Sequence, residues 1–529
     1  MLFFKKFVNL LLYFFIFFSL VFCESKKDIQ STATFIDLTR ATPESQGVTS
    51  ESISNFIDEL KKSDINFHSL MIVKNGNVIA EGWWDPYKPE YKHQLYSLSK
   101  AFTSTAIGFA VQEKLLTVED QVISFFPNQL PTEISENLAS LKIKHLLTMS
   151  LGQEEEPMNM VRNNPENTWV KSILSQPFVR KPGSKFKYTS ACTFLLSAII
   201  QKVTNEKLHD YLKPRLFEPL NINNSDWMEN PEGINTGGYG LRIKTEDIAK
   251  LGQLYLNKGE WNGKQIISEK WVTEATTKQI ESSAGDGDFT AYNDWSQGYG
   301  YKFWLNTVGG YRADGAYGQF SIVIPEKNLV VAITEESFSM GDSMELIWKY
   351  LIPYMDEKEN LKENPIALEN LNKKLENLEF CPPKTISNSV VIPNINRKEY
   401  ALNTNQFDTK SVQFDFSNEA CTLVVTEKSD EQLVIDFGFK KWITETNEKK
   451  IADSFFPVPG RIDFSSKIAG FAHWEDEKTL ILTSRFLENV HGDKMICTFE
   501  DNNLTIEFLN SEAQGKNIAD PRPIISGEF

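Results

Sequence analysis

Two serine–lysine pairs, each with the lysine three residues after the serine, are the groups in this sequence best suited to covalent chemistry. They are Ser97 with Lys100, in the stretch YSLSKAFTS, and Ser184 with Lys187, in the stretch SKFK. Residues three apart on a helix share a face, so the lysine can reach the serine hydroxyl and accept its proton. A partly desolvated lysine near the positive end of a helix has a lowered pKa, which suits a base. The same spacing is also typical of a helix start followed by a surface lysine.

The surroundings of the two pairs differ. After Ser97, apolar residues recur at helical spacing, which predicts a helix that opens at this serine. Ser184 follows a Pro-Gly pair, which predicts a turn into a strand and leaves Lys187 no helix face to share. The chain holds no G-x-S-x-G elbow, and nothing in the sequence points to a Ser-His-Asp triad, although it leaves one open. Ser97 and Lys100 are therefore the candidate nucleophile and base.

The order of the predicted elements indicates how this pair is positioned. Two predicted hairpins, at residues 67–84 and 318–337, bracket a long and mostly helical middle. This arrangement predicts an α/β (α+β sandwich) fold, in which both ends of one domain build an antiparallel sheet that helices cover. We expect this domain at 45–355, after a polar leader at 24–44.

The remainder of the chain has a different texture. Residues 356–385 are charged and poor in apolar side chains, as expected of a linker that is partly helical. Residues 386–529 alternate short strand-like runs with polar turns, which predicts a small all-β barrel or sandwich. A length of 529 residues agrees with two domains.

The N-terminal segment 1–23 reads as an export signal, because Lys5 and Lys6 precede an apolar run that ends at Cys23. Three fates are open: cleavage after Cys23, lipidation of Cys23, or retention as a membrane anchor. Phe22 is bulky where a lipoprotein has a small residue. Each fate places the remaining chain outside the cytoplasm, as a secreted, periplasmic or outer-surface membrane-anchored protein.

Charge and cysteine content narrow the possible partners. A net charge of −16 argues against nucleic acid as the main partner, since a polyanion would be repelled. The cysteines beyond the export segment fit no zinc spacing and are expected to be buried thiols, with a Cys421–Cys497 bridge as the alternative. The sequence implies no metal and no diffusible cofactor.

Several sequence blocks follow one another over about residues 45–350. They begin with the segment around YSLSK and continue with IKHLLTMSLGQ, KPGSKFKYTSACTFLLSAIIQKVT, LFEPLNINNSDW, GGYGLRIKTEDIAKLGQLYLNKGEWNGKQIIS and ADGAYGQFSIVIPEKNLVVAIT. In this order the blocks resemble those of the β-lactamase-related serine hydrolases. This group includes class C β-lactamases, DD-peptidases, related esterases and 6-aminohexanoate-dimer hydrolase. The C-terminal residues resemble the β-rich tail of some members.

The resemblance implies a role for each residue that matches the family's motifs. Ser97 is implied as the acylated nucleophile and Lys100 as its proton acceptor or relay. Tyr188 stands at the tyrosine of the Y-x-N motif, where a phenol or phenolate passes the proton to the leaving group. Ser190 occupies the asparagine position of that motif, so its contact with substrate or with Lys100 is open. A glycine-rich stretch at 237–240 matches a region that borders the site.

The third motif of the family departs from its usual form. Where the family often has K-T-G or H-T-G, this chain has Ala313, Asp314 and Gly315, so the cation that holds a substrate carboxylate is missing. If Asp314 faces inward, it repels such a carboxylate. The resemblance implies that the backbone N–H groups of Ala316 and Ser97 form the oxyanion hole. The variant A-x-G-x-x-G-Q resembles the nylon-oligomer hydrolase and esterase branch.

The sequence therefore predicts an exported serine hydrolase that cleaves an ester or amide through a Ser97 acyl-enzyme. The expected partner is a small ester, amide or peptide-like substrate, with a possible membrane tether through the N-terminal segment. Two alternatives stay open. One is a penicillin-binding DD-peptidase or β-lactamase, and the other is an inactive binding protein on the same fold, which the altered Ser190 and Ala313-Asp314 positions motivate.

Overall fold

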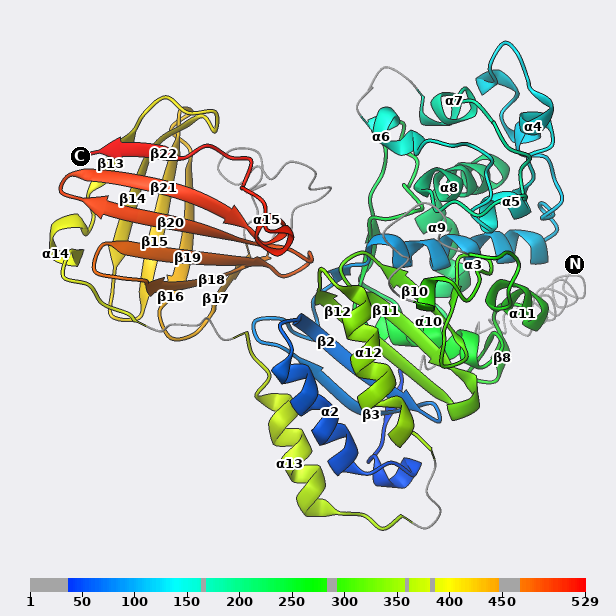
Figure 1. Ribbon diagram of the computed structural model, residues 1–529, viewed down its shortest axis with the longest axis horizontal. Coiled ribbons are helices and arrows are strands. Elements are labelled where there is room, and N and C mark those ends of the chain that lie inside the picture. The colour runs from blue at the N-terminus through cyan, green and yellow to red at the C-terminus, as the bar shows by residue number, and fades with distance from the viewer. Residues whose placement is uncertain (1–36, 163–167, 283–292, 357–360, 381–385, 447–466) are drawn as a thin grey trace, which may run out of the picture. The chain divides into compact units, whose positions relative to one another are not determined.

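The computed structural model describes residues 37–162, 168–282, 293–356, 361–380, 386–446 and 467–529 (Figure 1). The predicted export segment, Cys23, most of the polar leader and Cys381 lie outside these residues. None of the helices described here combines the length and apolarity that crossing a membrane requires.

A mixed sheet of seven strands, counted over the described residues, forms the centre of the first part of the chain. Its strands, in spatial order, are β1 (Thr39–Arg40), β3 (Asn77–Trp83), β2 (Asn66–Lys74), β12 (Leu329–Glu336), β11 (Gln319–Ile324), β10 (Tyr311–Gly315) and β9 (Trp304–Leu305). Each neighbouring pair is antiparallel except β1 with β3. The two predicted hairpins meet where β2 pairs with β12, so the expected sheet built from both ends of the domain is confirmed.

Local turn chemistry explains the first hairpin. Asn75 and Gly76 both have a left-handed backbone, with φ of 52° and 76°, as a tight two-residue hairpin turn requires. At the second hairpin, Pro325 opens a short 3-10 turn that ends at Asn328, whose φ is 47°. Both turns fix the register of the strands that carry the core.

Helices cover both faces of this sheet. Alternate side chains of a strand point to opposite faces. On one face Ser69 bonds Thr245 of α10 (Thr245–Leu256), and on the other Gly82 packs against Leu375 of α13 (Pro365–Glu376). Figure 1 shows α13 beside α2 (Ser50–Lys62) and α12 (Met340–Tyr350) over this second face. The helix α13 lies within the segment expected to be a linker.

The middle of the chain is mostly helical, as expected. Its helices are α3 (Ser99–Gln112), α4 (Glu136–Ala139), α5 (Ile143–Leu147), α6 (Pro157–Arg162), α7 (Trp169–Leu174), α8 (Ser190–Thr204), α9 (Leu208–Leu212) and α11 (Glu269–Thr276). Short strands β4 (His93–Gln94), β5 (Asp226–Trp227) and β6 (Leu241–Ile243) form a small second sheet, and β7 (Glu260–Trp261) pairs with β8 (Lys264–Gln265). The helix α3 packs against α8 and is buried along nearly its whole length.

The C-terminal residues form a closed barrel of nine strands, counted over the described residues. The barrel order is β16 (Gln432–Gly438), β15 (Ala420–Glu427), β14 (Thr409–Phe416), β13 (Glu399–Leu402), β22 (Ile525–Glu528), β21 (Asn503–Asn510), β20 (Gly492–Glu500), β19 (Thr479–Phe486) and β18 (Lys467–Trp474). A parallel bridge from Gly438 to Phe471 closes it, and β17 (Ile443–Thr446) adds to β18. Two short helices, α14 (Ile392–Ile395) and α15 (Ser511–Lys516), flank the strands. Of the two predicted forms, the barrel is therefore the one observed.

The barrel has its own apolar core, because alternate residues of its strands are buried. Cys421 and Cys497 lie in this core as free thiols, and Cys192 is a buried free thiol of the first core. The prediction of buried thiols is confirmed for these three cysteines, and the alternative Cys421–Cys497 bridge is not formed.

Candidate active site

Ser97 lies in a 3-10 turn, η2 (Tyr96–Leu98), directly before α3. The expectation that the α-helix opens at Ser97 is wrong by two residues, since α3 begins at Ser99. The reason is the residue before the serine: Tyr96 has a left-handed backbone with φ of 46°, so the chain enters the helix through a tighter turn. The hydroxyl of Ser99 donates to the Tyr96 carbonyl at 2.7 Å and holds this turn.

Lys100 lies one turn into the helical segment and its side chain is buried, with 1% of its surface exposed. Its ammonium donates to Ser97 Oγ at 2.8 Å, to the Gly238 carbonyl at 2.7 Å and to Ser190 Oγ at 3.3 Å. The predicted approach of the lysine to the serine is therefore present. Ser190, the short residue at the Asn position of the Y-x-N motif, still reaches Lys100.

These contacts define how a proton could move. A carbonyl oxygen only accepts, so one N–H of Lys100 is committed to Gly238. A hydroxyl both donates and accepts, so a neutral Lys100 can donate to Ser190 while it accepts the proton of Ser97. The arrangement thus accommodates both protonation states of the lysine without moving a heavy atom, as a proton acceptor requires.

Tyr188 lies in the loop before α8, close to the same lysine. Its ring centroid is 5.0 Å from Lys100 Nζ, and its ring stacks on Trp304 with centroids 5.6 Å apart. Burial raises the pKa of Tyr188 well above its usual value, the charge of Asp314 raises it further, and a hydrogen bond with Ser97 opposes both. The direction of this pKa shift favours the neutral phenol over the phenolate.

Asp314 is buried on β10 and is engaged by its neighbours. Its Oδ2 accepts from Arg312 Nε and from Trp295 Nε1, both at 3.1 Å. Burial raises the pKa of this carboxyl, while Arg312, Trp295 and a hydrogen bond from Trp304 oppose the rise. Asp314 is therefore linked by a hydrogen bond to Trp304, the residue on which Tyr188 stacks. Its predicted influence on a substrate carboxylate stays a prediction.

The end of β10 packs closely against the turn that carries the serine. A Cβ atom at Gly315 would lie 2.0 Å from the carbonyl oxygen of Leu95, so only glycine fits there. Ala313 is buried on the same strand, and Ala316 follows as an exposed turn residue. The assignment of the Ala316 and Ser97 N–H groups to an oxyanion hole remains a prediction, and this close approach supports it.

The glycine-rich stretch forms a tightly packed wall. Gly237 has φ of 67°, and a Cβ atom there would lie 2.8 Å from the Thr193 carbonyl oxygen. Its own carbonyl accepts from the Thr103 hydroxyl at 2.7 Å, which fixes the neighbouring Gly238 carbonyl toward Lys100.

The second serine–lysine pair is separate from this cluster. Ser184 is exposed in a turn, as predicted, and Lys187 contacts the carbonyl of Glu154. No strand follows this turn among the described residues, in contrast to the expectation, because the chain runs without a strand partner to α8.

Four groups near the site were not singled out from the sequence. They are the Gly238 carbonyl, Trp304, Arg312 and Gln319. Gln319 donates to the Ala316 carbonyl at 3.1 Å and to the Glu335 carbonyl at 2.8 Å, so it ties the turn to β12. The last position of the A-x-G-x-x-G-Q pattern was a signal for Gln319. A backbone carbonyl and a stacked tryptophan leave no comparable sequence signal.

The chain is similar to several known proteins. Residues 53–350 match the family described as Beta-lactamase. The chain is 30% identical over 229 residues to protein flp of Staphylococcus aureus (strain N315), which covers 40% of this chain and 45% of flp. It is 21% identical over 311 residues to 6-aminohexanoate-dimer hydrolase of Paenarthrobacter ureafaciens, which covers 55% of this chain and 78% of that protein. The match thus spans under half of the length of flp.

The chain also aligns with solved structures. The octameric penicillin-binding protein homologue from Pyrococcus abyssi aligns over 90% of this chain and 99% of its own, with a TM-score of 0.47 and 18% identity.

Proposed function

The chain belongs to the Beta-lactamase family, because residues 53–350 match it, and we propose that the protein is an exported serine hydrolase that cleaves an ester or amide through Ser97. The family predicted from the ordered sequence blocks is confirmed. Beta-lactamase-fold relatives include hydrolases such as 6-aminohexanoate-dimer hydrolase. The observation that carries the proposal is the approach of Lys100 Nζ to Ser97 Oγ at 2.8 Å, with the Tyr188 phenol bonded to the same serine.

In the proposed reaction, Lys100 accepts the Ser97 proton as Oγ forms a bond to the substrate carbonyl carbon. The carbonyl π electrons move to its oxygen, which the backbone N–H groups of Ser97 and Ala316 stabilise. When the oxyanion collapses, the bond to the leaving alcohol or amine breaks, and Tyr188 passes that group a proton that Lys100 replaces. Water then attacks the acyl-enzyme by the reverse proton path, releasing the acid and restoring Ser97.

We further propose a substrate that needs no carboxylate anchor. Ala313 offers no cation, and the nearest one on the strand, Arg312, has no exposed surface and is bound to Asp314. Adjacent residues of a strand point to opposite faces, so Arg312 cannot take the place of a cation at 313.

A labelling and turnover experiment tests the function. Wild-type protein, Ser97→Ala and Ser184→Ala are each exposed to a fluorophosphonate probe, short-chain chromogenic esters, neutral amides and a fluorescent penicillin. We expect Ser97→Ala to abolish labelling and turnover, and Ser184→Ala, the matched control from the second pair, to keep both. Ester hydrolysis by Ser97→Ala at the wild-type rate would refute the mechanism.

The same experiment separates the two alternatives. The family match favours a DD-peptidase or β-lactamase as the second candidate, and stoichiometric acylation of Ser97 by the penicillin would support it over the esterase or amidase. No acylation by any compound in the series would instead favour a binding protein on this fold.

Export is part of the proposal and is supported by Lys5, Lys6 and the apolar run up to Cys23. Cell fractionation should place the full-length protein outside the cytoplasm, and a chain lacking residues 1–23 should stay inside. Mass analysis of the mature N-terminus distinguishes cleavage, lipidation and retention.

A further inference from the structure

Two tyrosines with left-handed backbones flank the two backbone N–H groups assigned to the oxyanion hole. Tyr96 directly precedes Ser97 and has φ of 46°, and Tyr317 directly follows Ala316 and has φ of 65°. A bulky side chain in this region costs about 1–3 kcal/mol and persists only where the surroundings hold it. The contacts of these two tyrosines therefore bear on where the two N–H groups point.

Both tyrosine rings meet at one histidine of the C-terminal barrel region. The rings of Tyr96 and Tyr317 pack edge to face, with centroids 5.3 Å apart. The ring of His491 packs edge to face on Tyr317 at 4.6 Å and on Tyr96 at 6.0 Å. His491 belongs to the buried segment between β19 and β20, so the barrel supplies one wall of this aromatic cluster.

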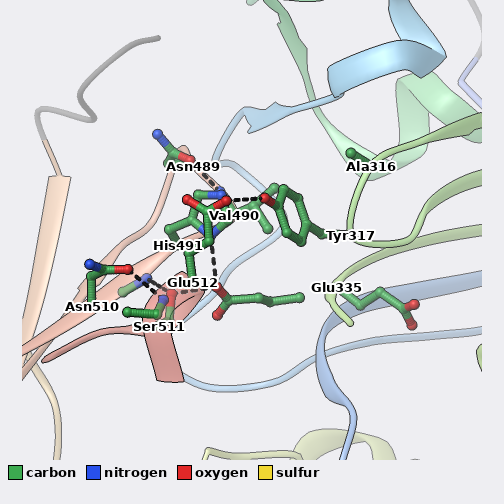
Figure 2. Close-up of polar contacts among 12 residues, drawn as sticks. Ala316, Tyr317, Glu335, Asn489, Val490, His491, Asn510, Ser511 and Glu512 are labelled. Carbon is green, nitrogen blue, oxygen red and sulfur yellow. Dashed lines mark hydrogen bonds and ion pairs between the residues drawn. The ribbon is translucent and has the colours of Figure 1, made fainter. Parts of the chain in front are cut away.

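Each tyrosine hydroxyl is also bonded to the barrel region. The Tyr96 hydroxyl lies 2.8 Å from His491 Nε2, across 395 positions of sequence. The Tyr317 hydroxyl donates to Glu512 Oε1 of α15 at 2.7 Å, and Figure 2 shows the Tyr317 ring extending away from Ala316 toward Glu512 and His491. Residues 37–529 form one compact unit, and both bonds lie within it.

His491 is itself fixed by a buried carboxylate at the end of β12. Its Nδ1 lies 2.7 Å from Glu336 Oε1, and Glu336 has no exposed side-chain surface. Arg485 of β19 donates to the same carboxylate at 2.8 Å, and the Ser511 hydroxyl donates to it as well. Because a carboxylate only accepts, Nδ1 carries a proton that points to Glu336. Glu336 thus sets the orientation of the histidine ring, with Nε2 toward Tyr96.

We propose that His491 and Glu512 are positioning residues, which hold Tyr96 and Tyr317 so that the N–H groups of Ser97 and Ala316 point to the oxyanion. This inference rests on the proposed function of Ser97. It makes the C-terminal barrel a component of the active site rather than an appended module. From the other side, Gln319 holds the Ala316 carbonyl, so the turn is fixed from both the sheet and the barrel.

A positioning role has a kinetic signature that a merely structural role lacks. The two N–H groups act on the charge that develops in the transition state, so their misplacement lowers kcat and leaves KM nearly unchanged. Removing one oxyanion donor costs about 10²–10³-fold in kcat, and a misaligned donor costs less. Loss of a hydroxyl that only aligns a donor is therefore expected to lower kcat about tenfold.

The test uses the full chain and four substitutions. Tyr96→Phe and Tyr317→Phe each remove one hydroxyl and keep the ring, so both variants are expected to fold. His491→Ala is made alone and together with Tyr96→Phe. The matched control is Trp442→Phe, which removes the hydrogen bond from Trp442 Nε1 to the Phe380 carbonyl at 3.2 Å, a contact that includes neither the two tyrosines nor His491 and Glu512.

We expect kcat for a chromogenic ester and the rate of fluorophosphonate labelling to fall about tenfold in Tyr96→Phe, Tyr317→Phe and His491→Ala, with KM unchanged. The effects of Tyr96→Phe and His491→Ala on kcat should not add, since both substitutions remove the same hydrogen bond between Tyr96 and His491. Trp442→Phe should keep the wild-type kcat. If the wild type is labelled but Tyr96→Phe and Tyr317→Phe keep the wild-type kcat and labelling rate, this inference alone is overturned. Absence of Ser97 labelling in wild type would overturn the proposed function and this inference together.

Discussion

The indole of Trp304 stacks on the phenol ring of Tyr188, with centroids 5.6 Å apart and planes 18° from parallel. A hydrogen bond also links Trp304 to Asp314, which is paired with Arg312 at 3.1 Å. Trp304 therefore connects Tyr188, the proposed proton shuttle, to the buried pair of Asp314 and Arg312. In the sequence, Asp314 suggested a change in the charge of the substrate. In the structure, the same residue also bonds Trp304.

The first prediction concerns that ion pair. Asp314→Asn removes the partner of Arg312, whose side chain is fully buried, and leaves its charge without compensation. Breaking a buried pair in this way costs about 3–5 kcal/mol of unfolding free energy. Urea denaturation should show this loss. The control is Asp58→Asn at a half-exposed pair with Lys374, where the change should stay below about 1 kcal/mol. Equal losses in both variants would contradict the role of the buried pair.

A second prediction separates the charge of Lys100 from its ability to release a proton. In Lys100→Arg the positive charge remains, but a guanidinium does not deprotonate in proteins. If Lys100 accepts the Ser97 proton, kcat/KM for a chromogenic ester should fall about 10²–10⁴-fold, the range for loss of general base catalysis. Lys187→Arg in the second pair is the matched control and should keep the wild-type value. A small effect of Lys100→Arg would show that charge alone suffices.

A third prediction uses the glycine wall that holds the Gly238 carbonyl toward Lys100. Gly237→Ala places a Cβ atom 2.8 Å from the Thr193 carbonyl oxygen, at a left-handed φ of 67°. The left-handed backbone costs about 1–2 kcal/mol, and the overpacking adds about 1–3 kcal/mol. We expect lower stability together with lower kcat, because the shift moves the acceptor of Lys100.

Gly263→Ala is the control for this substitution. Its φ of 73° is also left-handed, but nothing lies within 4 Å of the added Cβ atom. It should show the backbone cost in a thermal melt and the wild-type kcat. A wild-type kcat in Gly237→Ala as well would argue that the wall does not position Lys100.

The sequence was informative where the physics is local, and less so where it depends on distant partners. The Asn75-Gly76 turn and the alternating apolar runs beside it predict the first hairpin, because turn geometry and strand period are written in adjacent residues. The approach of Lys100 to Ser97 follows from helical spacing. In contrast, the bond from Tyr96 to His491 joins residues 395 positions apart, and no local pattern marks either one.

The same contrast explains the smaller errors. The start of α3 at Ser99 rather than Ser97 depends on the left-handed backbone of Tyr96, a bulky residue with no intrinsic preference for that conformation. Its ring contacts with Tyr317 and His491 accompany that conformation, and they exist only in the folded chain. The predicted roles of Ser190 and Asp314 were open for the same reason, since their partners come from other elements.

A last prediction concerns pH and a buried pair of histidines, His68 of β2 and His93 of β4. His68 Nδ1 lies 2.8 Å from His93 Nε2, and His93 Nδ1 lies 3.0 Å from the Gln94 carbonyl oxygen. The carbonyl only accepts, so His93 carries its proton on Nδ1, and its Nε2 accepts from His68. A second proton on His93 would face the N–H of His68. Burial lowers the pKa of His93 from 6.5 to about 4, and burial together with His93, Arg485 and His491 lowers that of His68 well below 6.5.

Since both folded-state pKa values lie below the unfolded value of 6.5, the unfolded chain takes up protons first as the pH falls. The stability that His93 contributes is therefore fully present above about pH 6.5 and is lost between pH 6.5 and about 4. From pH 7 to pH 5 His93 should account for about 2 kcal/mol of lost unfolding free energy, and His68 acts in the same direction. Urea denaturation at the two pH values measures this loss, and His93→Gln, which keeps a polar side chain but cannot titrate, should make it smaller. An identical loss in wild type and His93→Gln would exclude His93 as its source.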